Sequence, residues 1–312
     1  MNQKSWPIII HLVIAAGVIS ATLSSIAAAQ TPRQPAPSTI VLGIASAVHQ
    51  QEIESHYSPL VRYVARRISP AADTEGKVVV ADDLAQLVKL LDQKTVDFYI
   101  DSAYPTYVVN HVHGAAKLLL RRWQRGKAEY QSLIFTKRDS GVARLDDLRG
   151  KIIAFEDPES TSGHFLAKFF LLRNGFKLAE RTRADAPATP SEIGYLFAHS
   201  QEKLLDLVLS KQVAAGVFSD DDYAKLDEKQ RADINVLAKT ELLPRHLLSV
   251  RKDMAPALAD RLEAILLSMH EDDEGRSILQ KTADTTKFDR LPGGEEGMRR
   301  RLLETFFSVQ KK

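Results

Sequence analysis

Short apolar segments alternate with segments of helical period along most of the chain after residue 38. Residues 39–45 form a short apolar run, which predicts a buried strand, and residues 54–68 place apolar side chains at helical spacing. Alternation of this kind is typical of α/β folds in which helices flank mostly parallel sheets. No period of about 20–50 residues repeats, which excludes a solenoid.

The alternation continues to residue 269. Strands are predicted at residues 39–45, 78–81, 96–100, 116–120, 130–136, 151–155, 193–198, 213–218, 234–240 and 247–250. Helices are predicted at residues 54–68, 84–91, 104–111, 162–173, 201–209 and 256–269. Asp82 or Asp83 can cap the second of these helices. The length of 312 residues fits two domains, because domains usually have roughly 100–200 residues.

The first 29 residues have the layout of a secretory signal peptide. Lys4 gives the start a positive charge, residues 8–19 are nearly all apolar, and Ala27 and Ala29 are the small residues that a signal peptidase reads. A membrane-spanning helix needs about 20 apolar residues, and this run is shorter. We therefore expect cleavage after Ala29, a disordered segment over residues 30–37, and a mature protein in the periplasm.

The composition excludes several kinds of site and partner. The chain has no cysteine, so disulfides, thiolate metal sites and cysteine nucleophiles are excluded. Its formal net charge is only +2, which argues against nucleic acid as a partner. The basic residues Arg121, Arg122, Arg125 and Lys127 surround Trp123, and we predict that this run is solvated surface. A contact with a membrane partner is the alternative.

Four predicted strands are followed by polar junctions. In open α/β sheets, ligands bind beyond the carboxyl ends of the strands, where the next helix begins. The junctions fall at Ser46, at residues 101–104, at residues 157–163 and at residues 219–223. We expect a binding site to be assembled from such positions.

The junction at residues 157–163 is the most informative of the four. Ser160, Thr161 and Ser162 place three hydroxyls beside the N–H groups of a helix start, and Gly163 would let a ligand approach the backbone. Unpaired N–H groups and the helix dipole favour an anion at such a position. The alternative is an ordinary helix cap, for which one hydroxyl suffices.

In their order along the chain, several sequence blocks resemble one family. Residues 157–163 read DPESTSG before an apolar helix, residues 129–140 read EYQSLIFTKRDS, and residues 145–155 read LDDLRGKIIAF. Residues 247–253 read LLSVRKD and residues 272–278 read DDEGRSI. This arrangement is similar to the PhnD-type periplasmic substrate-binding proteins of phosphonate, phosphate and phosphite ABC transporters. The resemblance extends over roughly residues 40–290.

The resemblance implies a type II periplasmic-binding-protein fold with two α/β lobes and two crossover segments. Lobe 1 would contain residues 38–137 and 243–312, and lobe 2 would contain residues 138–241. A small oxyanion would bind between the lobes. The implied contacts are Ser160, Thr161, Ser162 and Gly163, then Tyr130, Ser102, Tyr104 and Tyr107, and also His199, Ser200, Asp220 and Asp221.

The first-lobe loop departs from the family pattern. It reads DSAYPTY over residues 101–107, without the usual glycine and with an added acidic residue, Asp101. Asp101 could repel a fully ionised phosphate, or it could pair with an amine on the ligand. Ser46, at the first junction, completes the candidate ligand contacts.

Three functions remain open at this point. The first is capture of an oxyanion and its delivery to an ABC-transporter permease, and the second is presentation of a ligand to a separate histidine kinase. The third, a secreted hydrolase, lacks support because no G-x-S-x-G, H-E-x-x-H or phosphate-loop motif is present. We expect a monomer with no catalytic residue, no cofactor and no metal. His164 and His199 are expected to be structural or solvated rather than metal ligands.

Overall fold

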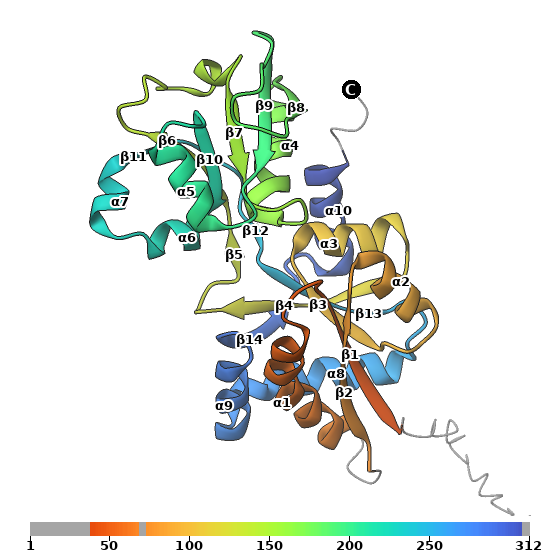
Figure 1. Ribbon diagram of the computed structural model, residues 1–312. Helices are drawn as coiled ribbons and strands as arrows, with labels where there is room; N and C mark the ends of the chain where they lie inside the picture. The colour runs from red at the N-terminus through yellow and green to blue at the C-terminus, as the bar shows by residue number, and fades with distance from the viewer. Residues whose placement is uncertain (1–37, 69–72, 308–312) are drawn as a thin grey trace, which may run out of the picture. The chain divides into compact units, whose positions relative to one another are not determined.

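A computed structural model describes residues 38–68 and 73–307 of the chain (Figure 1). The expected signal peptide, residues 1–29, and the expected disordered segment, residues 30–37, lie outside the described residues. The described part contains two six-stranded sheets and one two-stranded sheet, with helices packed against the larger sheets. The predicted α/β class is therefore confirmed.

The first sheet has the strand order β14-β4-β13-β3-β1-β2. Its strands are β1 (Thr39–Ala45), β2 (Glu75–Ala81), β3 (Phe98–Asp101), β4 (Ala116–Gln124), β13 (His246–Arg251) and β14 (Thr285–Arg290). Strands β2 and β3 run parallel to β1, whereas β13 and β14 pair antiparallel with their neighbours. The sheet is thus mixed rather than mostly parallel, because the chain returns to it late and adds β13 and β14.

The second sheet has the order β11-β6-β10-β7-β9-β8. Its strands are β6 (Ser132–Lys137), β7 (Ile152–Phe155), β8 (Lys177–Glu180), β9 (Glu192–Phe197), β10 (Ala215–Ser219) and β11 (Ile234–Lys239). Strands β7, β8, β9 and β10 are parallel, and β6 and β11 pair antiparallel. The expectation of a mostly parallel sheet holds here.

A short antiparallel pair, β5 (Glu129–Tyr130) with β12 (Leu243–Pro244), stands where the chain passes between the two sheets. Strand β6, which begins two residues after β5, already pairs in the second sheet. The first passage therefore falls near Gln131, whereas the sequence placed it after Lys137. The sequence pattern predicted one continuous strand over residues 130–136, although the polar residues Gln131 and Ser132 lie where the chain changes sheet.

Helices cover both large sheets. The α-helices are α1 (Gln50–Ile68), α2 (Leu84–Asp92), α3 (Ala103–Tyr107), α4 (Leu166–Arg173), α5 (Gln201–Leu209), α6 (Asp220–Lys225), α7 (Glu228–Asp233), α8 (Pro256–Ser268), α9 (Asp273–Lys281) and α10 (Gly294–Phe306). Two segments are π-helical. The first, η1 (Val108–Val112), directly follows α3, and the second, η3 (Thr161–Phe165), directly precedes α4. The 3-10 turns are η2 (Leu145–Leu148) and η4 (Met269–Glu271). As the sequence predicted, Asp83 caps α2.

The apolar core has layers on both sides of each large sheet. Helices α1, α8 and α9 bury one face of the first sheet, and α2 packs on the other. A separate apolar cluster joins α3 and α10 to α4, with Phe169 and Phe306 among its members. These layers fix the ends of β3 and β7, and with them the helices that begin there.

Candidate functional site

Two helix starts meet through hydrogen bonds. Helix α3 begins after β3, and the π-helical segment η3 follows β7 after the loop that contains Ser160. The Tyr104 backbone N–H donates to Thr161 Oγ1 at 3.1 Å, and the Thr161 hydroxyl donates to Ser102 Oγ at 2.9 Å. The junctions at residues 101–104 and 157–163 are thus brought together. The Tyr104 N–H at the start of α3 therefore meets the Thr161 hydroxyl at the start of η3, and N–H groups at a helix start are favourable partners for an anion.

Tyr130 and Ser162 lie beside this contact. Burial raises the pKa of the Tyr130 phenol to about 12, and the hydroxyls of Ser162 and Thr161 act in the opposite direction. Ser132 Oγ donates to the Ser162 carbonyl oxygen at 2.6 Å, which holds the start of η3 against β6. We call Asp101, Ser102, Tyr130, Thr161 and Ser162 the strand-end cluster.

Ser160 and Gly163 have different roles from the other residues of their motif. Ser160 Oγ accepts from the Gly163 N–H at 2.9 Å and donates to Glu156 Oε2 at 3.1 Å, so its hydroxyl acts as the cap of η3. A Cβ at Gly163 would lie 2.6 Å from Glu156 Cβ and 2.9 Å from Ser160 Oγ. Gly163 therefore makes room for Glu156 and Ser160, whereas the sequence suggested room for a ligand.

Asp101 closes β3 beside Ser102. Its Oδ1 accepts from the Ser102 N–H at 2.7 Å and from the Ser102 hydroxyl at 3.3 Å. Burial raises the pKa of the Asp101 carboxyl to about 7, although the Ser102 hydrogen bonds and the positive charge of Arg122 oppose the shift. Near neutral pH this carboxyl is therefore partly protonated, and a charged group of a ligand beside it would change its degree of protonation.

Sequence reasoning missed three basic side chains near the cluster. Arg122 is 1% exposed, which contradicts the prediction that its basic run is solvated surface. Its Nη1 donates to Tyr57 Oη at 2.8 Å, and its Nη2 donates to His246 Nδ1 at 3.1 Å. Burial, together with the charges of Arg122 and Arg245, holds the pKa of His246 well below its usual range. We call Arg122, Arg245 and His246 the basic trio.

The alternation of side chains along β4 could have revealed Arg122. Leu118, Leu120 and Arg122 lie two residues apart, and side chains at that spacing share one face of a strand. The predicted strand stopped at Leu120, four residues before β4 ends at Gln124. As a result, the four basic residues that follow were treated as one surface.

Aspartates 220 and 221 are engaged by the protein itself. Asp221 forms an ion pair with Arg245 and another with Lys127, the latter at 3.0 Å. Asp220 Oδ1 accepts from the Gln131 N–H at 3.3 Å. These contacts tie α6 to the passage between the sheets, beside the strand-end cluster.

Tyr104 and Tyr107 are packed by aromatic neighbours. Tyr104 stacks on Phe165 with ring centroids 3.3 Å apart, and Tyr107 lies 5.5 Å from Phe306. Burial raises the pKa of both phenols. At this position Tyr104 contributes its backbone N–H to the site, while its ring packs against η3.

Ser46, His199 and Ser200 make local contacts instead of joining the cluster. Ser46 Oγ donates to the Val48 carbonyl at 2.8 Å, and Ser200 caps α5 by accepting from the Lys203 N–H at 3.2 Å. His199 is an exposed residue with a positive φ of 61°, and its Nδ1 is 3.9 Å from Asp157 Oδ2. The structure therefore does not bring these three side chains to Thr161.

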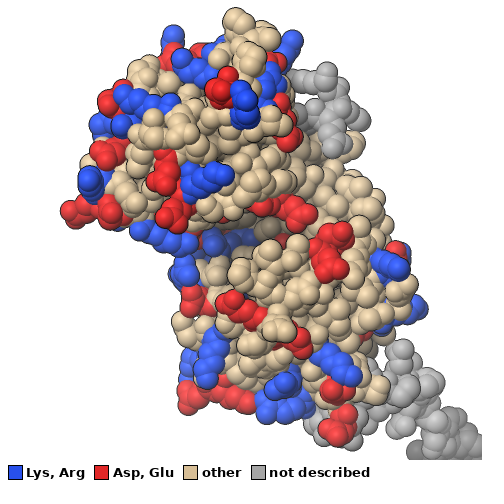
Figure 2. Space-filling model, in the orientation of Figure 1, with Lys and Arg blue, Asp and Glu red and all other residues tan. Residues whose placement is uncertain are grey.

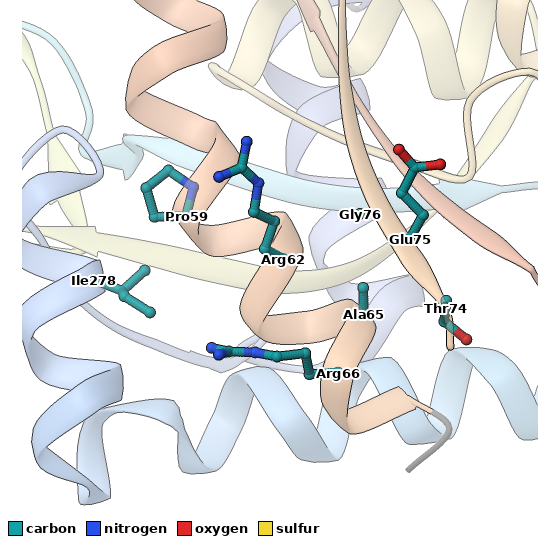
Figure 3. A pocket seen from close by; sticks show the side chains of 8 residues that line it. All are labelled: Pro59, Arg62, Ala65, Arg66, Thr74, Glu75, Gly76 and Ile278. Carbon is teal, nitrogen blue, oxygen red and sulfur yellow. The ribbon is translucent and has the colours of Figure 1, made fainter. Parts of the chain in front are cut away.

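Metal sites, membrane-spanning helices and other pockets would also bear on the function of the described residues. They contain no group of three or more His, Asp or Glu placed to hold a metal ion, and none of their helices is long and apolar enough to span a membrane. A hollow of about 460 Å³ between α1 and β2 is lined by Arg62, Arg66 and Glu75, away from the strand-end cluster (Figure 3). On the face shown in Figure 2, basic and acidic side chains are interspersed.

Two mixed α/β sheets with helix starts that converge at their strand ends define a binding protein of the type II periplasmic class. The chain belongs to the family described as "ABC transporter, phosphonate, periplasmic substrate-binding protein", whose profile matches residues 42–291. It is therefore PhnD-like, as the resemblance in its sequence implied. Members of this family bind substrates for transport.

Individual proteins are also similar to this chain. The chain is 24% identical over 237 residues to the phosphate-import protein PhnD of Mycolicibacterium smegmatis, covering 73% of this chain and 71% of that protein. It is also similar to the solved structure of XAC2383 from Xanthomonas citri bound to ATP, with 29% identity and a TM-score of 0.76 over 88% of this chain and 98% of that one.

A third relative is a sensor. The tetrathionate sensor histidine kinase TtrS of Salmonella typhimurium is 25% identical over 236 residues, which is 73% of this chain. The match spans only 39% of the kinase.

Proposed function

We propose that this protein captures a small oxyanion at the strand-end cluster and delivers it to the permease of an ABC transporter. The observation that supports the site best is the meeting of two helix starts through Thr161, Ser102 and the Tyr104 N–H. Hydrogen-bond donors of this kind suit the oxygens of a phosphate or phosphonate group. A ligand would replace the direct Thr161–Ser102 bond with bonds to its own oxygens.

The two large sheets are proposed as the two lobes of the binding protein. Lobe 1 would comprise residues 38–130 and 243–307, and lobe 2 residues 132–241, adjusted from the sequence-based boundaries to follow the strand pairing. We also propose that the protein acts as a monomer. Sizing with light scattering, with and without ligand, tests that state.

The proposed ligand class can be tested by a thermal-shift screen. Phosphate, phosphite, methylphosphonate, ATP and tetrathionate are suitable probes, because the last two are named with relatives of this chain. A ligand that binds only the folded state stabilises it by about 2.7 kcal/mol at a hundredfold excess over its Kd. We expect a shift with a phosphorus oxyanion, and no shift with any of them would contradict the proposal.

Presentation of a ligand to a histidine kinase is the second candidate, and the similarity to TtrS favours it. The two functions differ in the membrane partner that receives the loaded protein. Stimulation of a permease–ATPase encoded beside this protein would support transport. Stimulation of a neighbouring kinase instead would support sensing.

Export also belongs to the proposal. We propose that residues 1–29 are removed and that Gln30 begins the mature chain, which would place the protein in the periplasm as family membership suggests. Mass spectrometry of the exported protein should find a chain that starts at Gln30. An intact Met1 terminus on exported protein would contradict this.

A further inference from the structure

The buried guanidinium of Arg122 has no counter-charge in hydrogen-bonding contact. Its side chain is 1% exposed, and its partners are the neutral Tyr57 hydroxyl and His246 Nδ1. Its Nε has no hydrogen-bond partner among the described residues. Burial of an ion without an opposite charge is strongly unfavourable, so an anion that reached this group would be held firmly.

Neighbouring arginines are compensated, which sets Arg122 apart. Arg121, on the other face of β4, pairs with Asp289 at 2.7 Å and with Glu129 at 3.4 Å. Arg245 pairs with Asp221. The fold thus provides carboxylates for the two arginines nearest in sequence or space, and it leaves Arg122 with neutral acceptors.

A continuous series of contacts connects Arg122 with the proposed anion site. Arg122 faces His246 across β4 and β13, and Leu247, the next residue, faces Asp101 across β13 and β3. On the other side, the Arg245 guanidinium lies 5.1 Å from the centre of the Tyr130 ring, and Tyr130 adjoins Thr161 and Ser162. The basic trio and the strand-end cluster therefore lie at the same end of the first sheet, and the contact between Arg245 and Tyr130 joins them.

We propose that Arg122, with Tyr57 and His246, binds a second negatively charged group of the ligand. The ligand class would then be a phosphorus anion with two anionic groups, such as a phosphonocarboxylate or a pyrophosphate. This inference rests on the proposed function, because the helix starts at Thr161 and Tyr104 hold the first group. A ligand that bears an ammonium group would be disfavoured by the charge of Arg122.

The competing role of Asp101 is to pair with a ligand amine. Its carboxylate is already engaged by the N–H and the hydroxyl of Ser102. Burial raises the pKa of Asp101 to about 7 in spite of the charge of Arg122, so the carboxyl is a weak source of negative charge at this position. An aminoalkylphosphonate is therefore the informative comparison ligand.

The test compares three phosphonates on the chain that starts at Gln30. Methylphosphonate has one anionic group, phosphonoacetate has two, and 2-aminoethylphosphonate replaces the second with an ammonium group. Titration calorimetry gives the affinities, and the fluorescence of Trp123, next to Arg122 in β4, gives an independent signal. We expect the Kd of phosphonoacetate to be lower than that of methylphosphonate by a factor of about ten or more. The Kd of 2-aminoethylphosphonate should be the highest of the three.

The Arg122→Met variant separates the second-group role from a structural one. We expect it to lose the preference for phosphonoacetate and to keep its methylphosphonate affinity within about threefold, while the lost hydrogen bonds to Tyr57 and His246 lower its melting temperature without unfolding it. Arg121→Met is the matched control and should keep the preference. An equal loss of affinity for all three ligands would show that Arg122 is structural and would overturn the inference.

The remaining outcomes distinguish this inference from the proposed function. If methylphosphonate binds and phosphonoacetate binds no better, the second-group inference is wrong and the oxyanion site stands. Tighter binding of 2-aminoethylphosphonate would assign the second position to Asp101 and contradict the role of Arg122. If no phosphorus oxyanion binds, the proposed function itself fails.

Discussion

At the scale of single residues, Asp101 sets a distinctive dependence of stability on pH. Its folded-state pKa of about 7 is above the value of about 3.9 expected in the unfolded chain. Between these values the unfolded chain loses the proton while the folded protein keeps it. The contribution of this group to stability is therefore fully present below pH 4 and is lost as the pH rises through 7.

Asp101→Asn removes that dependence. As the pH rises from 4 to 8, the unaltered protein loses the stability that protonated Asp101 contributes, and the variant does not. We therefore expect the difference in free energy of unfolding between the two proteins to shift in favour of the variant over this range and to be smallest at pH 4. Urea denaturation of both proteins at several pH values measures the difference. Parallel stability curves would mean that Asp101 ionises as freely in the folded protein as in the unfolded chain.

At the scale of elements, neighbouring residues at the start of η3 have separate roles: Ser160 stabilises the segment, and Thr161 belongs to the proposed binding site. Ser160 Oγ accepts from the Gly163 N–H and so caps the segment, whereas Thr161 Oγ1 reaches Ser102 and Tyr104 on another element. Ser160→Ala should therefore cost about 1 kcal/mol of stability and change ligand affinity little. Thermal melting and calorimetry on this variant check both quantities, and a large loss of affinity at unchanged stability would reassign Ser160 to the ligand.

Sequence patterns located most elements because apolar periodicity reflects burial. Helix α5 was predicted at residues 201–209, as found, and β1 was predicted at residues 39–45. Strand β8 was missed, since its four residues, Lys177–Glu180, include two charged side chains and only partly buried apolar ones. Strand β14 was also missed, and β13 was predicted without its antiparallel direction, because pairing depends on contacts between residues far apart in the chain.

Only the part of the candidate site that lies in one local stretch of sequence could be predicted. The motif at Ser160–Thr161–Ser162 is local and was visible, and the structure brings it to Ser102 and Tyr104. Arg122, Arg245 and His246 come from β4 and the start of β13, which sheet pairing alone places together. Asp221 was expected to face the ligand, yet Lys127 and Arg245 engage it through contacts across about 90 and 24 residues of sequence.

At the scale of the whole molecule, ligand binding is expected to close the lobes. The chain passes between the two sheets at the β5–β12 pair, where Tyr130 faces Leu243, and a short pair of this kind can act as a hinge. Small-angle scattering should give a smaller radius of gyration in saturating ligand than without it. An unchanged radius with a ligand that binds by calorimetry would argue that the site forms without lobe movement.

The central claim is that Thr161 helps bind a phosphorus oxyanion. Its most direct test is calorimetric titration of methylphosphonate into the unaltered protein and into Thr161→Val, which removes the hydroxyl and keeps the side-chain shape, with Thr161→Ser as the variant that should recover binding. A hydrogen bond to a charged group contributes about 1.5–3 kcal/mol. We predict a roughly tenfold to hundredfold weaker Kd for Thr161→Val. The ligand-free variant should also melt at a lower temperature, because it lacks the hydrogen bonds to Tyr104 and Ser102, and both effects should be reversed in Thr161→Ser. The same affinity in Thr161→Val as in the unaltered protein would contradict the account.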